Sequence, residues 1–302
     1  MGPEAFNILY QFLVNFAFLL FAAMGLIVVL GMLNIINLAH GEFIMLGAYV
    51  STLSYHAGVP FALAIPIATV AVGLLGMVLE RTVIRRFYAN KLNALVATFG
   101  ISLILSQGTL LVFGPYLNAI PMPFGGFEYG GYSYSTYFMA LAGGAFALLI
   151  VGWLFFYRSR LGMEMRATIQ NKEMARALGV RGERMDTLTF GLGAALAGLT
   201  GALYAPTTTV VPLFGQTFIA PAFITVVIGG GVNPLIGALS SAGFLSTIST
   251  PLSASLGTFA GRIGLMLAAL LIIRFLPQGL SFYLQDISLS GWTRVFRKVR
   301  NP

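Results

Sequence analysis

The sequence predicts an all-α fold, a polytopic transmembrane helical bundle of about eight to ten spans. Of the 302 residues, 58% are hydrophobic and only 9% are charged, and the mean hydropathy is +0.88, whereas about a quarter of the residues in a soluble domain are charged. No charged residue occurs between Thr187 and Gly261, and no Lys or Arg precedes Arg81. Uncharged runs can therefore cross a bilayer several times. We expect residues 1–302 to form a single transmembrane domain.

Nine apolar runs are candidate membrane spans, each near the length of about 20 residues that a transmembrane helix needs. The runs are 9–33, 38–56, 60–80, 93–114, 136–157, 187–205, 216–232, 235–255 and 259–276. The chain starts "MGPEAFNILYQ", without the basic segment that opens a cleaved signal peptide, so we expect the first run to be a retained span.

The basic residues indicate the topology. Fifteen of the 17 Lys and Arg residues fall in three clusters, 81–91, 158–184 and 294–300. The positive-inside rule places all three clusters in the cytoplasm, which leaves the N-terminus outside and the C-terminus inside. The net charge of +8 thus reflects topology and does not indicate a nucleic-acid partner. The connection between the fourth and fifth spans has no Lys or Arg and is rich in Tyr, Phe and Gly, which suits an external loop at the membrane interface.

Four polar residues, Asn34, Asn37, His40 and Glu42, lie in the stretch "NIINLAHGEF" between two apolar runs. An ionisable side chain facing lipid costs at least about 2.5 kcal/mol, so these residues must face protein or water. Three interpretations remain open: a turn at the membrane surface, a buried network that locks helices together, and the lining of a transport pathway or gate. On a continuous helix, Asn34, Asn37 and Gly41 would share one face.

Two further patterns concern helix packing and helix breaks. Small residues recur four positions apart in span 187–205, at Ala194, Gly198 and Ala202 and at Ala197 and Gly201, which predicts close approach of helix backbones. The segment 226–243 contains three consecutive glycines, Asn233 and Pro234, which predict a broken helix or a loop between two spans. Its likeness to 28–41 favours two related halves with a pathway between them, so Asn233 is another pathway candidate.

Signatures of an enzyme or a cofactor site are missing. The chain contains no GxxxxGK, no HExxH and no cysteine, and His40 and His56 are its two histidines. The residues for ATP binding by a P-loop, for a zinc protease or for a Ser/His catalytic site are therefore not supplied. We expect no catalytic residue, no cofactor and no metal site.

The loop 158–186 between the fifth and sixth spans contains "NKEMARALG". This segment predicts a short amphipathic helix with Met174, Ala177 and Leu178 on one face and Lys172, Glu173 and Arg176 around the other. It is either a docking helix or a solvated surface helix.

"EMARALG", Glu173 to Gly179, resembles the cytoplasmic coupling motif E-x-A-x-x-x-G of ABC importer permeases, the helix that docks into separate ATPase subunits. Together with "NIINLAHGEFIMLGAYV" and "LPQGL", the chain is similar over most of its length to branched-chain amino-acid permeases of the LivH type. The resemblance implies an inner-membrane importer subunit with two cytoplasmic ATP-binding subunits, a second permease, related or identical, and an external solute-binding protein. It also implies that the coupling residues are Glu173, Ala175, Arg176, Leu178 and Gly179.

Other functions remain possible on the sequence alone. Within the same family, a urea, short-amide or other small-solute permease would look alike, because the binding protein selects the solute. From another class, a self-sufficient secondary transporter or channel would need an embedded acid for a coupling ion, for which Glu42 and Glu80 are the candidates. Glu80 adjoins Arg81 at a span end and is better explained as a surface ion pair.

Overall fold

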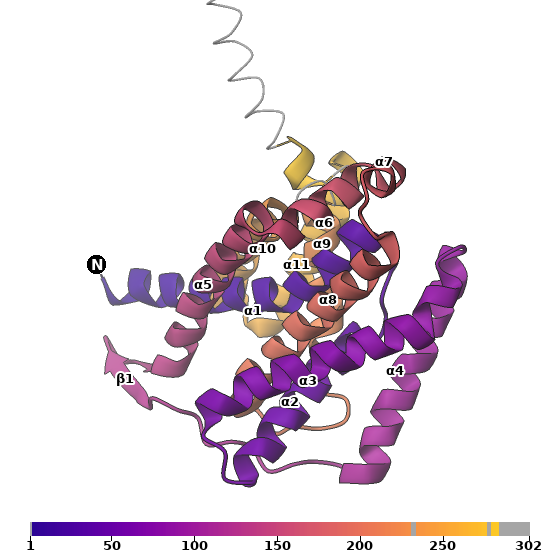
Figure 1. The fold of residues 1–302 in the computed structure, drawn as a ribbon. Helices are drawn as coiled ribbons and strands as arrows, with labels where there is room; N and C mark the ends of the chain where they lie inside the picture. Colours follow the sequence, from indigo (N-terminus) through magenta and orange to yellow (C-terminus); the bar gives the residue numbers. More distant parts are fainter. Residues whose placement is uncertain (1, 231–233, 277–278, 284–302) are drawn as a thin grey trace, which may run out of the picture.

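The computed structural model describes residues 2–230, 234–276 and 279–283, and this part of the chain is a helical bundle (Figure 1). The long helices are α1 (Pro3–Leu33), α2 (His40–His56), α3 (Phe61–Thr82), α4 (Lys91–Phe113), α5 (Thr136–Arg158), α8 (Gly182–Tyr204), α9 (Gln216–Gly229), α10 (Pro234–Leu256) and α11 (Thr258–Phe275). The shorter elements are α6 (Arg160–Gln170), α7 (Lys172–Ala177), the 3-10 turns η1 (Ile84–Phe87) and η2 (Ala205–Thr207), and the strands β1 (Gly126–Tyr129) and β2 (Tyr132–Ser135).

Each predicted span corresponds to one helix, and the predicted all-α bundle is confirmed. Within the described ranges, seven helices are long and apolar enough to cross a membrane. The other two, α2 and α9, have 17 and 14 residues, fewer than the about 20 that a perpendicular crossing needs. They are short because α2 begins only after the polar stretch and α9 ends at the glycine run, where Gly230 has φ +75°.

Helix α8 is packed on three sides, against α1, α2 and α3. Its small residues make this possible: a side chain at Gly201 would collide with the carbonyl oxygen of Ile44 in α2, and one at Gly47 would collide with the backbone of Gly198. The close backbone approach predicted from the small-residue spacing is therefore present in the structure.

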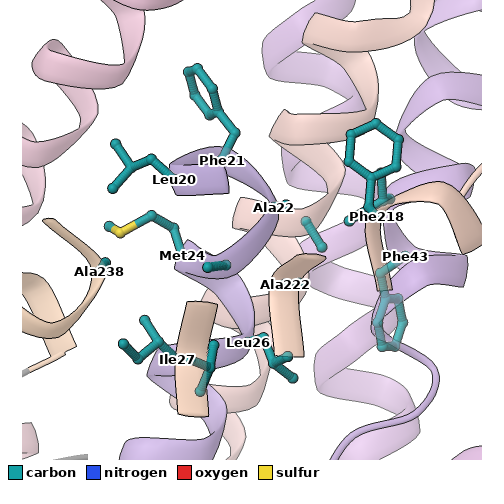
Figure 2. Packing of buried hydrophobic residues seen from close by; sticks show 14 of the residues in the cluster. Leu20, Phe21, Ala22, Met24, Leu26, Ile27, Phe43, Phe218, Ala222 and Ala238 are labelled. Carbon is teal, nitrogen blue, oxygen red and sulfur yellow. The ribbon is translucent and has the colours of Figure 1, made fainter. Parts of the chain in front are cut away.

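Helix α1 forms the centre of the hydrophobic core and contacts α5, α8, α9 and α10. Almost every residue from 16 to 29 is buried. Figure 2 shows Met24 of α1 directed toward Ala238 of α10, and Leu26 of α1 on the side of Ala222 of α9. By contrast, α4 lies at the edge of the bundle with many exposed apolar side chains (Figure 1), as expected of a helix facing lipid or another subunit.

The predicted loop between α4 and α5 contains a β-hairpin that was not expected from the sequence. Strands β1 and β2 pair antiparallel around Gly130 and Gly131, which have φ of 61° and 84°, the left-handed geometry of a two-residue hairpin turn. The hairpin packs against the start of α1, where the Tyr10 hydroxyl donates a hydrogen bond to the carbonyl oxygen of Ser135 at 3.1 Å. The signal was present as Gly-Gly between alternating aromatic residues.

Candidate functional site: the segment between α5 and α8

The segment 158–186 folds into two short helices at one end of the bundle (Figure 1). Ser159 caps α6, since its Oγ accepts a hydrogen bond from the Gly162 N–H at 2.9 Å. Asn171 caps α7 in the same way, with its Oδ1 accepting from the Met174 N–H at 2.9 Å. Both caps satisfy N–H groups that a helix start leaves without partners, so α6 and α7 are separate helices at a fixed junction.

Helix α7 ends in a Schellman motif. The Val180 N–H donates to the Ala175 carbonyl oxygen and the Gly179 N–H to the Arg176 carbonyl oxygen, both at 3.0 Å. Gly179 has φ +91°, a conformation that costs a larger residue about 1–2 kcal/mol. Gly179 therefore sets the direction in which the chain leaves α7.

An ion pair ties α7 to α8. The Lys172 Nζ donates to both carboxylate oxygens of Asp186, at 2.9 and 2.8 Å. Asp186 is buried and Lys172 is partly exposed, so the bond lies at the edge of the protein. The sequence placed Lys172 on the polar face of α7 but did not indicate its partner, which the structure supplies because the turn at Gly179 brings α8 back beside the start of α7.

The predicted amphipathic pattern of α7 is present, but with its apolar face turned outward. Ala175 is buried, while Met174 and Leu178 are 59% and 78% exposed. Glu173, Arg176 and Ala177 are exposed around them. An apolar surface presented by a short, firmly anchored helix is typical of a protein–protein contact.

A second polar cluster links the end of α3 to α8. Glu80 is fully buried, and Arg85 donates to both its carboxylate oxygens, at 3.2 and 3.1 Å. The Tyr88 hydroxyl donates to Glu80 Oε1 at 3.0 Å, and Arg85 also contacts Glu183 and Thr187 of α8. The hydrogen bond to Glu80 raises the pKa of Arg85, and burial together with the Glu80 charge raises the pKa of Tyr88. The expected surface pair of Glu80 with Arg81 is wrong, because η1 folds Arg85 back over Glu80.

Residues 34–39 form a break between α1 and α2, which begins at His40 and includes Glu42, so Asn34, Asn37 and Gly41 do not lie on one continuous helix. Asn34 is exposed and ends α1 with a left-handed φ of 53°. Asn37 is buried, and its Oδ1 accepts from the Ala39 N–H at 3.1 Å. His40 is also buried, with Nε2 2.9 Å from the Ala22 carbonyl oxygen in α1.

Glu42 differs from its neighbours in this stretch. It is 3% exposed, and its Oε2 has no hydrogen-bond partner among the described residues. A buried polar atom without a partner requires an explanation, and Glu42 is therefore the strongest pathway candidate of the stretch. Asn233, the fifth candidate, lies outside the described residues.

A family model described as "branched-chain amino acid transport system / permease component" matches residues 8–276. The chain belongs to this family. The permease is 28% identical over 261 residues to the LivH high-affinity branched-chain amino acid transport permease of Salmonella typhimurium, covering 81% of this chain and 84% of the relative. It is 29% identical over 291 residues to BraD of Pseudomonas aeruginosa, covering 89% and 85%. It is 27% identical to LivM of Escherichia coli strain K12, covering 80% of this chain and 63% of the relative. No solved structure matches.

The permease is thus a multi-pass membrane subunit of a transport system, and the resemblance read from the sequence is confirmed. In the described part of the chain, no three His, Asp or Glu residues are grouped as a metal site would require. Sequence patterns alone did not single out Asp186 and Arg85. Asp186 pairs with Lys172 across the turn at Gly179, and Arg85 pairs with Glu80 through η1. The spacing of residues along the sequence does not predict either turn.

Proposed function

We propose that the permease is a subunit of an ATP-binding-cassette importer that moves leucine, isoleucine or valine inward, delivered by an external binding protein. It has no catalytic residue of its own; two cytoplasmic ATP-binding subunits hydrolyse ATP, and a second permease, related or identical, completes the membrane part. The protein lies in a bacterial inner membrane with its N-terminus outside and its C-terminus in the cytoplasm. The relatives LivH and BraD are named as branched-chain amino acid permeases, which supports leucine, isoleucine or valine as the solute.

One observation carries the coupling role: α7 presents Met174 and Leu178 to solvent while Ala175 and Lys172 fix it to the bundle. Leu178 supplies an apolar anchor for the ATP-binding subunit, with Glu173 or Arg176 as the polar rim. In such interfaces a few buried anchors contribute most of the binding free energy.

The test is ATP hydrolysis by the whole importer in reconstituted vesicles. We expect Leu178→Asp to separate transport from hydrolysis, because a carboxylate would be buried at the contact, and Leu178→Met to retain coupling. We expect Gly179→Val to have the same effect as Leu178→Asp, because it redirects the chain at the end of α7. ATPase activity should then no longer respond to loaded binding protein, or the ATP-binding subunits should dissociate.

Gly58 offers a matched control for Gly179. It has φ +92°, open space within 4 Å of the position that a Cβ would take, and the same Schellman hydrogen bonds, from Gly58 N–H to Tyr55 and from Val59 N–H to Ser54. Gly58→Val therefore carries the same local strain in the connection between α2 and α3 and should leave coupling intact. Full substrate-stimulated ATPase and uptake in both Gly179→Val and Leu178→Asp would refute the coupling role.

The solute and the rival class have separate tests. Calorimetry on the partner binding protein distinguishes branched-chain amino acids from urea or short amides. Solute flux by the purified chain without ATP-binding subunits would instead favour a secondary transporter or channel.

A further inference from the structure

An open hollow with a volume of about 700 Å³ lies where α3 ends and α8 begins. Five arginines line it, together with a single acidic residue, Glu183; the arginines are Arg81, Arg85, Arg176, Arg181 and Arg184. They come from three elements that are separate in sequence, the end of α3 with η1, helix α7, and the start of α8.

Most of this positive charge is not neutralised. Arg85 is held by Glu80, Glu183 and Thr187. The other four arginines of the hollow have no hydrogen-bonded or ion-paired acceptor within the described part of the chain. The N-terminus of α8 adds its partial positive charge at Gly182, which also lines the hollow. A concave surface of this kind favours an anion that accepts several charge-assisted hydrogen bonds.

A second hollow continues from the first along the same pair of helices. It has a volume of about 300 Å³ and lies between α3, α8, α5 and α6. Its lining is apolar apart from Thr69, and Leu188 lines both hollows. Two of its lining residues, Val70 and Leu74 of α3, are 58% and 56% exposed, as expected of side chains that face lipid. The first hollow, which is cationic, and the second hollow, an apolar groove, therefore meet at Leu188, near the end of α3 and the start of α8.

We propose that these two hollows form a binding site for one anionic phospholipid, whose phosphate headgroup lies among Arg81, Arg176, Arg181 and Arg184 and whose acyl chain lies in the apolar groove. A soluble phosphate compound would use only the arginines and would leave the groove exposed to the bilayer. An acidic segment of a partner protein would likewise leave the groove without an occupant. A phospholipid has the charge and the chain that match both parts.

The site also has a structural consequence, because Arg176 belongs to α7 and Arg81 to α3. A headgroup bound between them gives α7 a connection to the transmembrane bundle in addition to the Lys172–Asp186 pair. This inference does not depend on the identity of the transported solute.

The experiment titrates the purified full chain in detergent with palmitoyl-oleoyl phosphatidylglycerol or the matching phosphatidylcholine and counts bound lipid by native mass spectrometry. We expect selective retention of phosphatidylglycerol. The variant Arg81→Gln/Arg184→Gln should bind it about 30-fold more weakly, equivalent to about 2 kcal/mol for two basic residues. The control Arg86→Gln/Arg158→Gln removes the same charge from exposed residues outside the hollow and should bind normally.

The groove is tested separately. Leu74→Trp should lower affinity about 15-fold, since each buried acyl methylene contributes about 0.8 kcal/mol and we expect the indole to displace two. Val78→Trp is its control, because Val78 is equally exposed on the same helix, at 56%, but does not line the groove. Thermal melting shows whether each variant is folded. If Arg81→Gln/Arg184→Gln is unfolded, the comparison of Leu74→Trp with Val78→Trp tests the proposal.

Three results would overturn the proposal. Equal loss of lipid in both double arginine variants would show attraction by general surface charge. Displacement by glycerol 1-phosphate, with no effect of Leu74→Trp, would show a soluble phosphate site. Displacement of the lipid when the ATP-binding subunits are added would show that the arginines belong to a protein interface.

Discussion

The buried pair of Glu80 and Arg85 allows a quantitative prediction about stability. Arg85→Gln leaves the Glu80 carboxylate, which is fully buried, with the Tyr88 hydroxyl but without its cation. Breaking a buried ion pair from one side typically costs about 3–5 kcal/mol. The Arg85 side chain is 27% exposed, so water offsets part of the loss, and we expect about 2–3 kcal/mol.

The assay is thermal melting of the purified permease in detergent. For a chain of 302 residues, 1 kcal/mol corresponds to about 1.6 °C, so Arg85→Gln should melt about 3–5 °C below the wild type. The control Arg86→Gln removes an exposed charge one residue away and should change stability by no more than about 0.5 kcal/mol.

A double variant distinguishes the cost of leaving Glu80 without its cation from the cost of changing the side chain at position 85. In Glu80→Leu/Arg85→Met both charges are replaced by apolar groups of similar size, a change that is often close to neutral. We expect this variant to melt nearer to the wild type than Arg85→Gln does. If Arg85→Gln melts together with Arg86→Gln, Glu80 has water or another partner and the reasoning from burial is refuted.

The remaining predictions concern the membrane topology and the polar residues at the break between α1 and α2. Cysteine introduced at Asn171 should be labelled only from the cytoplasm and cysteine at Gly126 only from outside; external labelling of position 171 would reverse the arrangement. His40→Leu should lower thermal stability by about 1 kcal/mol through loss of its hydrogen bond to Ala22, and an unchanged melt with reduced uptake would instead assign His40 to the pathway. Glu42→Gln should leave the melting temperature nearly unchanged and reduce solute uptake; normal uptake would remove Glu42 from the pathway.

The sequence predicted the positions of the helices better than the contacts between them, because the bilayer requires an apolar run to be helical but does not determine which helices touch. Hydrocarbon excludes unpaired backbone groups, so an apolar run of about 20 residues has to be helical whatever lies beside it. The same argument does not say which helix is central. Helices α1 and α4 are both strongly apolar, yet α1 is buried and α4 is at the edge, because contacts depend on partners that composition does not reveal.

Local turns explain why contacts at the candidate site were not predicted from the sequence. Gly179 follows the end of α7, and its left-handed conformation brings Asp186 within reach of Lys172, 14 residues away. The break between α1 and α2 agrees with the predicted spans 9–33 and 38–56, but its geometry was not predicted: Asn34 takes a left-handed conformation, which few non-glycine residues adopt.

The connection between α7 and the polar break passes through α8. Lys172 holds α7 to Asp186 near the start of α8, and further along, Gly201 approaches the carbonyl oxygen of Ile44 in α2 so closely that a side chain would not fit. Helices in such contact cannot slide past each other without loss of packing, because protein interiors are close-packed. A displacement of α7 that passes into α8 would therefore also move α2, which begins at His40, unless it is absorbed at 178–181. Gly179 lies in that connection, so we expect its conformation to affect how much of such a displacement reaches α8.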